Sequence, residues 1–195
     1  MPALDADAIL AATEDVLRRH GPGKANVVDV ARALGVSHAA VYRYFPSKAA
    51  LREAVARRWL TRGAHRLRRI ATDAALPPAE RLRAWLLALF ADKRARAADD
   101  PELFATFGLL VTEHREVAAE HVADLVDQLR GIVADGIAGG GFVRGDPDAI
   151  AHAVFVATTA FHHPAHAGEW PAPDREAALQ GVCDLILDGL RGRGR

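Results

Sequence analysis

The stretch of residues 29–48 constrains the fold most, because it predicts two short helices joined by a tight turn. Apolar side chains up to Leu34 recur at helical spacing and give the first helix one buried face. Gly35 follows the last turn of that helix, where a left-handed cap is required. Ser37 is the expected N-cap of the second helix, which begins at His38. The pattern predicts a helix-turn-helix.

The second helix of this motif is very short. Its inward-facing residues are expected to be Ala40, Val41, Tyr44 and Phe45. Its outward-facing residues are expected to be His38, Ala39, Tyr42 and Arg43. Small side chains let a helix approach base edges closely and polar ones reach them, so the outward face is typical of a helix that reads DNA.

The next helix begins with a second cap. Ser47 is its expected N-cap, which places Lys48 at the positive end of the helix. Backbone amides and an ammonium group together make a phosphate site, so Lys48 is a candidate contact to the DNA backbone.

The net charge of zero hides an asymmetry. Residues 1–70 hold 13 Lys and Arg against 6 Asp and Glu, a balance of +7, and the remaining residues hold 12 against 19, a balance of −7. One end of the chain therefore suits a polyanion. Six arginines that follow the motif contribute much of this excess: Arg57, Arg58, Arg62, Arg66, Arg68 and Arg69. They allow three interpretations, a solvated surface, a phosphate-contacting flank or an interdomain set of salt bridges.

Helical periodicity continues through the rest of the chain, and no segment shows the period-two alternation of a strand. Beyond the motif, helices are expected over about residues 7–20, 47–72, 78–98, 101–107, 112–138, 147–163 and 174–190. The sequence therefore predicts an all-α protein of nine helices.

The motif resembles the TetR (tetracycline-repressor-like) family of bacterial regulators. The resemblance lies in Gly35-Val36-Ser37, in Val41–Phe45 and in Pro46–Leu51, and it extends over residues 7–60. It implies a three-helix helix-turn-helix DNA-binding domain at residues 1–50, with the helix at 47–72 as connector. A larger helical domain at 78–195 would bind an effector and form a homodimer.

The resemblance also implies roles for individual residues. The family's base-reading positions correspond to His38, Ala39, Ala40 and Arg43, its phosphate contacts to Tyr42, Tyr44 and Lys48, and its positions near the DNA backbone to Asn26 and Val27. With the cap Ser37 they form the candidate DNA-binding set. The family commonly has Lys-Gly-Thr or Lys-Ala-Ser after this serine. Here His38-Ala39-Ala40 offers fewer hydrogen bonds, so Arg43 is expected to carry more of the readout.

A small-molecule effector pocket is expected in the larger domain. Its candidate residues are Trp85, Leu89, Phe104, Phe107, Leu110, His121, Phe155 and His162. An apolar set with a few polar groups is the usual composition of such a site.

Six of the nine histidines fall in this part of the chain: His114, His121, His152, His162, His163 and His166. A divalent metal site, a pocket for an acidic ligand, and scattered core or surface histidines all remain open. No Glu-x-x-His pair occurs, which disfavours a di-iron bundle. No cofactor is expected, with a divalent metal at the histidines as the alternative.

The last two helices carry small and apolar residues suited to a homodimer interface. The candidates are Ala153, Ala157, Leu179, Val182 and Ile186. A plain intradomain core is the alternative. A symmetric dimer would double the DNA site of a single helix-turn-helix.

No catalytic motif emerges, so the chain is not expected to be an enzyme. Gly139-Gly140-Gly141 lacks a following Lys-Ser/Thr, and the single Cys183 lies in an apolar helix. No apolar run is long enough to span a bilayer and no signal peptide is evident, so we expect a cytoplasmic protein without a membrane partner. The expected function is a repressor of a palindromic DNA operator. A metal-dependent helical-bundle enzyme and a constitutive DNA-binding protein without an effector are the alternatives.

Overall fold

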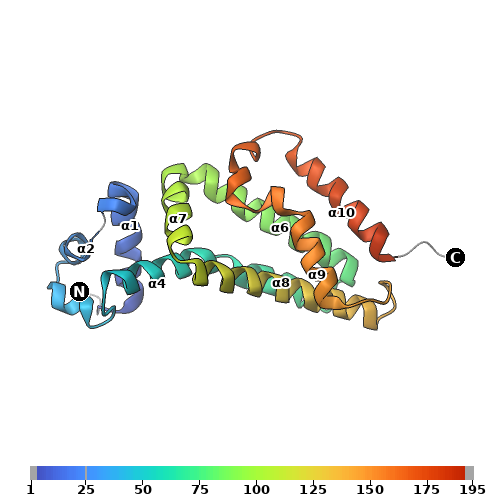
Figure 1. The fold of residues 1–195 in the computed structure, drawn as a ribbon, viewed down its shortest axis with the longest axis horizontal. Helices are drawn as coiled ribbons and strands as arrows, with labels where there is room; N and C mark the ends of the chain where they lie inside the picture. The colour runs from blue at the N-terminus through green and yellow to red at the C-terminus, as the bar shows by residue number, and fades with distance from the viewer. Residues whose placement is uncertain (1–3, 25, 192–195) are drawn as a thin grey trace. The chain divides into compact units, whose positions relative to one another are not determined.

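The computed structural model describes residues 4–24 and 26–191, and in this part of the chain the secondary structure is entirely helical (Figure 1). The helices are α1 (Ala6–Lys24), α2 (Val27–Leu34), α3 (His38–Tyr42), α4 (Lys48–Thr61), α5 (Ala64–Ala71), α6 (Pro78–Asp99), α7 (Pro101–Glu113), α8 (Arg115–Ala138), α9 (Pro147–Ala157) and α10 (Arg175–Arg191). Two short 3₁₀ helices, η1 (Thr159–Phe161) and η2 (Pro164–Glu169), lie between α9 and α10. The predicted all-α class is confirmed.

The helix predicted over residues 47–72 is broken in two. α4 ends at Thr61 and α5 begins at Ala64, because Gly63 adopts a left-handed conformation with φ of 95°. Only glycine adopts such a φ at low cost. A Cβ at this position would also lie 2.9 Å from Nη2 of Arg96. The prediction of a single connecting helix is therefore wrong.

Two further predicted helices differ from the structure, one by a break near its start and one by an early end. In the helix predicted over residues 112–138, His114 has φ of −110° and ψ of 65°, so α7 stops before it and α8 starts after it. The helix predicted over 147–163 ends at Ala157 and gives way to η1 and η2. His163 precedes a proline and is extended, with φ of −82° and ψ of 129°.

The chain divides into two compact units. The headpiece unit comprises the residues up to Arg62 together with Asp100–His121, and the body unit comprises Gly63–Asp99 together with the residues from Val122 onward. Helix α7 and the start of α8 therefore group with the helix-turn-helix, whereas the sequence assigned them to the larger domain.

In the headpiece unit, α7 packs on α1 and α4. Trp59 of α4 stacks on Phe107 of α7 with ring centroids 4.8 Å apart and planes within 4°. Arg18 of α1 donates from Nε to Oδ2 of Asp100, the N-cap of α7, at 2.6 Å. This bond holds the pKa of the Asp100 carboxyl below its usual range and raises the pKa of Arg18. Aromatic stacking and an ion pair thus fix α7 to the helices around the motif.

In the body unit, α6 packs against α5 and α10, and α8 supplies buried side chains to the same core. The indole of Trp85 is fully buried and donates to Oε1 of Gln128 at 3.0 Å. Gln128 in turn donates from Nε2 to Asp124 at 2.9 Å. Both buried polar groups are satisfied, which avoids the cost of an unpaired buried donor or acceptor.

Candidate nucleic-acid interface and small-molecule site

The turn of the predicted helix-turn-helix forms as expected. Asn26 caps α2, with its side-chain oxygen accepting from the backbone N–H of Asp29 at 3.0 Å. Gly35 ends α2 in the left-handed conformation with φ of 66° and ψ of 31°. Ser37 caps α3, with its hydroxyl accepting from the N–H of Ala40 at 3.2 Å. The two helices are thus fixed at both sides of the turn by the predicted capping residues.

The exposed face of α3 agrees with the prediction in most positions. His38, Ala39, Tyr42 and Arg43 are exposed, Val41 is fully buried, and Ala40 and Phe45 are half-buried. Tyr44 was expected to pack inward, but its side chain is 39% exposed. Its hydroxyl donates to the carbonyl of Leu4 at 2.5 Å, so the proton that a phosphate contact would use is engaged within the chain.

Two further candidates stand at helix starts. Lys48 is the first residue of α4, is exposed, and follows the N-cap Ser47, whose hydroxyl accepts from Ala50 N at 3.0 Å. Asn26 is exposed, but Val27 is only 4% exposed and packs in the core. A DNA contact through the Val27 side chain is therefore contradicted, and a contact through its main chain stays a prediction.

Most of the arginines that follow the motif are paired with carboxylates. Arg57 pairs with Glu53 and Glu120, Arg58 with Asp7 and Glu14, Arg62 with Glu14, and Arg68 with Asp124. Each of these pairs lies within one compact unit rather than between the two. These four arginines therefore form salt bridges, but within a unit and not between the two units as the interdomain interpretation expected.

The predicted pocket residues fall into two groups. Phe104, Phe107, Leu110 and His121 belong to the headpiece unit, whereas Trp85, Leu89, Phe155 and His162 belong to the body unit. In the first group Phe104 and Phe107 contact Trp59, with the Phe104 ring edge-on at 5.7 Å, and they act there as packing residues. In the second group Trp85, Leu89 and His162 are buried in the body unit, and Phe155 is half-buried.

His162 is buried next to Phe155. The two rings stack at 4.3 Å, and Nε2 of His162 lies 3.0 Å from the Phe155 carbonyl oxygen, so that nitrogen carries the proton and donates. Burial, with a smaller contribution from the charge of Lys93, lowers the pKa of His162 to about 4. His162 is therefore neutral at physiological pH.

The remaining histidines of this region serve different local roles. His163 caps η2, with Nδ1 accepting from Ala165 N at 3.2 Å, and Nδ1 of His166 lies 3.0 Å from Oε1 of Glu169. His152 is exposed on α9. Within the described residues, no group of three or more His, Cys, Asp or Glu side chains could hold a metal ion.

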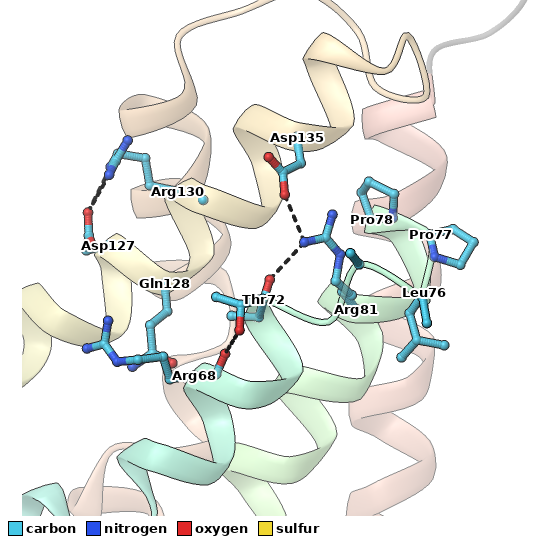
Figure 2. A pocket seen from close by; sticks show the side chains of 14 residues that line it. Arg68, Thr72, Leu76, Pro77, Pro78, Arg81, Asp127, Gln128, Arg130 and Asp135 are labelled. Carbon is cyan, nitrogen blue, oxygen red and sulfur yellow. Dashed lines mark hydrogen bonds and ion pairs between the residues drawn. The ribbon is translucent and has the colours of Figure 1, made fainter.

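An open cleft of about 680 Å³ lies in the body unit, bounded by α5, the start of α6 and α8; we call it the α5–α6–α8 cleft (Figure 2). Its charged lining residues are Arg68, Arg81, Arg130, Asp127 and Asp135. Its apolar lining comes from Leu76, Pro77, Pro78 and nearby alanines. None of the predicted pocket residues lines this cleft. The sequence missed it because its residues come from two stretches, 68–81 and 127–135, that lie far apart along the chain.

Family models match both parts of the chain. The model described as "Bacterial regulatory proteins, tetR family" matches residues 9–55, and "Tetracyclin repressor-like, C-terminal domain" matches residues 78–183, which is more than half of the chain. The chain belongs to the TetR family. A search of curated proteins gave no match.

Solved structures share the fold of this TetR-family regulator. The transcriptional regulator FadR from Bacillus subtilis in complex with stearoyl-CoA is 19% identical with a TM-score of 0.70, over 95% of this chain and 100% of that one. SmeT, the repressor of the Stenotrophomonas maltophilia multidrug efflux pump SmeDEF, is 21% identical with a TM-score of 0.72, over 98% and 92%. A TetR transcription regulator from Haloarcula marismortui is 19% identical with a TM-score of 0.72, over 95% and 97%. None of the described helices of the regulator is both long and apolar enough to cross a membrane.

The regulator exposes apolar side chains on α9 and α10. Among the predicted interface residues, Ala153 and Ala157 are exposed, and Val182 and Ile186 are half-buried. Leu179 is 1% exposed and belongs to the core of the single chain, so its assignment to an interface is wrong. The sequence also missed the most exposed members, Val156 at 56% and Leu185 at 75%.

Proposed function

We propose that this regulator is a homodimeric repressor that binds a palindromic DNA operator through α3 and leaves it when a small molecule binds. The observation that carries the proposal is the capped α2–turn–α3 unit, which exposes His38, Ala39, Tyr42 and Arg43 on one short helix. A recognition helix of this kind enters the major groove with its first residues toward the bases.

Arg43 and Lys48 have different roles in this proposal. Arg43 ends α3 and is exposed, and a guanidinium can make two hydrogen bonds to one guanine edge. Lys48 lies at the positive end of α4, where it and the backbone amides suit a phosphate. The charge balance of +7 over residues 1–70 favours approach to DNA of any sequence.

The homodimer is supported by the apolar surface of α9 and α10. Leu185, 75% exposed, and Val156, 56% exposed, would leave water on association. The alanines beside them allow two helices to approach closely. Two copies of α3 related by a two-fold axis would then read two half-sites, as a palindrome requires.

The effector is supported by the similar structures. FadR from Bacillus subtilis was solved in complex with stearoyl-CoA, and SmeT, 21% identical with a TM-score of 0.68, was solved as a triclosan complex. By analogy a small molecule would bind this chain and change its affinity for DNA, to the extent that it prefers one of two states. The predicted pocket residues remain a prediction for where an interior ligand would bind.

A DNA-binding experiment tests this function. DNA selected from a random library and the promoter beside the gene would be titrated with the wild type and single variants by fluorescence anisotropy at several salt concentrations. We expect Arg43→Ala to weaken the cognate site by about 1–3 kcal/mol and to relax one base position. We expect Lys48→Ala to weaken all sequences alike and to reduce the salt slope by about 1.

The control is Arg144→Ala, which removes an exposed arginine of the body unit and should leave both affinities unchanged. If Arg43→Ala and Lys48→Ala weakened cognate and random DNA equally, the assignment of α3 as the reading helix would be wrong.

A further inference from the structure

We propose that the α5–α6–α8 cleft binds the carboxylate of a small organic acid, with the guanidinium of Arg81 as its anchor. Binding to the cleft stands on the geometry alone. The consequence for DNA release rests on the proposed repressor function.

Arg81 is a buried cation with a spare donor. Its side chain is 7% exposed, and its Nη1 donates to the Ala71 carbonyl at 2.9 Å and to Oδ2 of Asp135 at 2.8 Å (Figure 2). Its Nε is buried and has no hydrogen-bond partner among the described residues. Buried donors in proteins are normally paired, and a guanidinium is shaped to bind a carboxylate with two parallel hydrogen bonds. Arg81, which lines the cleft, therefore has an unused donor for an anionic oxygen.

Asp135 occupies this anchor in the free chain. Figure 2 shows its carboxylate reaching from α8 toward the Arg81 guanidinium. The Asp135 side chain is 60% exposed, so its pairing is open to water and weakly held. A ligand carboxylate can take its place on Arg81 without leaving the arginine unpaired, and Asp135 can turn outward into solvent.

The walls of the cleft select the kind of acid. Leu76, Pro77 and Pro78 line one side and offer an apolar surface to the body of a ligand. Asp127 and Asp135 place negative charge on the opposite side. Arg130 pairs with Asp127 and Arg68 pairs with Asp124, so the cleft offers a dianion no second unpaired cation, and a phosphate monoester is disfavoured relative to a monocarboxylate. The cleft therefore suits an organic acid with a compact apolar body.

The cleft is connected to the core of the body unit. Arg68, on its α5 side, pairs with Asp124, which accepts from Gln128, which in turn accepts from Trp85. A ligand that draws Arg68 or Arg81 toward itself therefore acts on α5 and α6 together. α5 begins at Ala64, directly after Gly63, and Gly63 is the residue at which the chain enters the body unit from α4 and the headpiece unit.

Calorimetry with small probes tests the site. Benzoate and octanoate would be titrated into the full-length protein at pH 7 against benzyl alcohol and octanol, which have the same apolar bodies without the charge. We expect at least one acid to bind about tenfold or more tightly than its alcohol, as a hydrogen-bonded charge pair implies. Equal affinity of both acids and their alcohols would overturn the proposal, and so would tighter binding of phenyl phosphate or inorganic phosphate than of either acid.

Variants separate the anchor from general packing. Asp135→Asn removes the internal competitor and should tighten acid binding about tenfold, which a merely structural role of Asp135 would not do. Arg81→Gln should abolish the preference for the acid. Arg83→Gln is the matched control, because Arg83 lies on the same helix but pairs with Asp184 outside the cleft. Arg81→Gln alters a buried residue, and if the Arg81→Gln variant does not fold, acid binding by Asp135→Asn is the deciding measurement. Unchanged or weaker acid binding by Asp135→Asn would overturn the proposal.

The site and the repressor function fail in different ways. If the acid binds as expected but leaves the affinity for operator DNA unchanged, the proposed acid-binding site is supported and its proposed role as the effector site is wrong. If operator release is induced by a compound that binds Arg81→Gln as well as the wild type, the repressor function stands and this cleft is not its effector site.

Discussion

Lys93 is the residue whose replacement should stabilise this protein most clearly. It lies on α6, is 7% exposed, and is one of three lysines in the chain. Burial lowers its pKa from an ordinary value of 10.5 to about 8, and the charge of Arg96 adds to this effect while Asp92 opposes it. Folding therefore buries a side chain that is protonated at neutral pH, in surroundings that disfavour its charged form.

The size and sign of the effect follow from linkage. A pKa lowered from 10.5 to about 8 corresponds to a penalty of about 3 kcal/mol below pH 8, where Lys93 is protonated in both the folded and the unfolded chain. Between pH 8 and 10.5 the unfolded chain binds more protons than the folded one. The stability of the wild type therefore rises with pH through this window, and the penalty disappears above it.

Lys93→Met removes the charge and keeps an unbranched side chain that is one heavy atom shorter. We expect a gain of about 1–3 kcal/mol in the free energy of unfolding at pH 7, because loss of the attraction to Asp92 offsets part of the relief. At about 2–4 °C per kcal/mol for a chain of this size, Tm should rise by several degrees. The gain should shrink toward zero as the pH approaches 10.5.

Urea unfolding followed by circular dichroism, at fixed protein concentration and at pH values from 7 to 10.5, measures this difference. Lys48→Met is the matched control, since Lys48 is exposed and its loss should change stability little at any pH. A variant at Lys93 that is no more stable than the wild type at pH 7, or whose gain persists unchanged to pH 10.5, would refute the argument.

Two further predictions concern the chain junction and the dimer. Gly63→Ala should lower stability by roughly 1–3 kcal/mol in thermal unfolding, because φ is 95° and the new Cβ would lie 2.9 Å from Nη2 of Arg96. Gly108→Ala is the control, since this glycine lies in a helix with open space around it and its replacement should not lower stability. Equal losses of stability in the two variants would contradict the argument. Leu185→Glu should convert a dimer to monomers, as measured by light scattering, and should abolish operator binding. Leu109→Glu alters another exposed leucine and should do neither. A Leu185→Glu variant that stays dimeric would exclude this face as the interface.

The parts of the fold that the sequence predicted well depend on neighbours along the chain. Ser37 and Ser47 cap α3 and α4 as expected, and Gly35 ends α2, because each of these contacts spans three or four residues. The break at Gly63 was missed because a single glycine is tolerated within helices, and its left-handed φ depends on what surrounds it. His114 carries no local signal for a helix end at all.

Faces and sites were harder to predict because they depend on contacts between distant segments. Leu179 and Leu185 are both apolar residues of α10, yet one is buried in the core and the other is 75% exposed. Hydrophobic spacing alone cannot tell which of two apolar stripes faces the chain's own body. The α5–α6–α8 cleft was out of reach for the same reason, since Arg81 and Asp135 lie 54 residues apart.

The grouping of α7 with the helix-turn-helix restricts how an effector could act. The chain passes between the two units at Arg62–Gly63, at Asp99–Asp100 and at His121–Val122. The third passage lies within the continuous helix α8, and at the second Asp100 is held by Arg18 and by its own cap on Leu103. Asp100 is also outside helical geometry but is held by these bonds, whereas Gly63, with φ of 95°, is a glycine and keeps the conformational freedom to change. Any ligand-driven change in the body unit that reaches α3 should therefore be absorbed first at the α4–α5 junction, whose second helix forms one side of the α5–α6–α8 cleft.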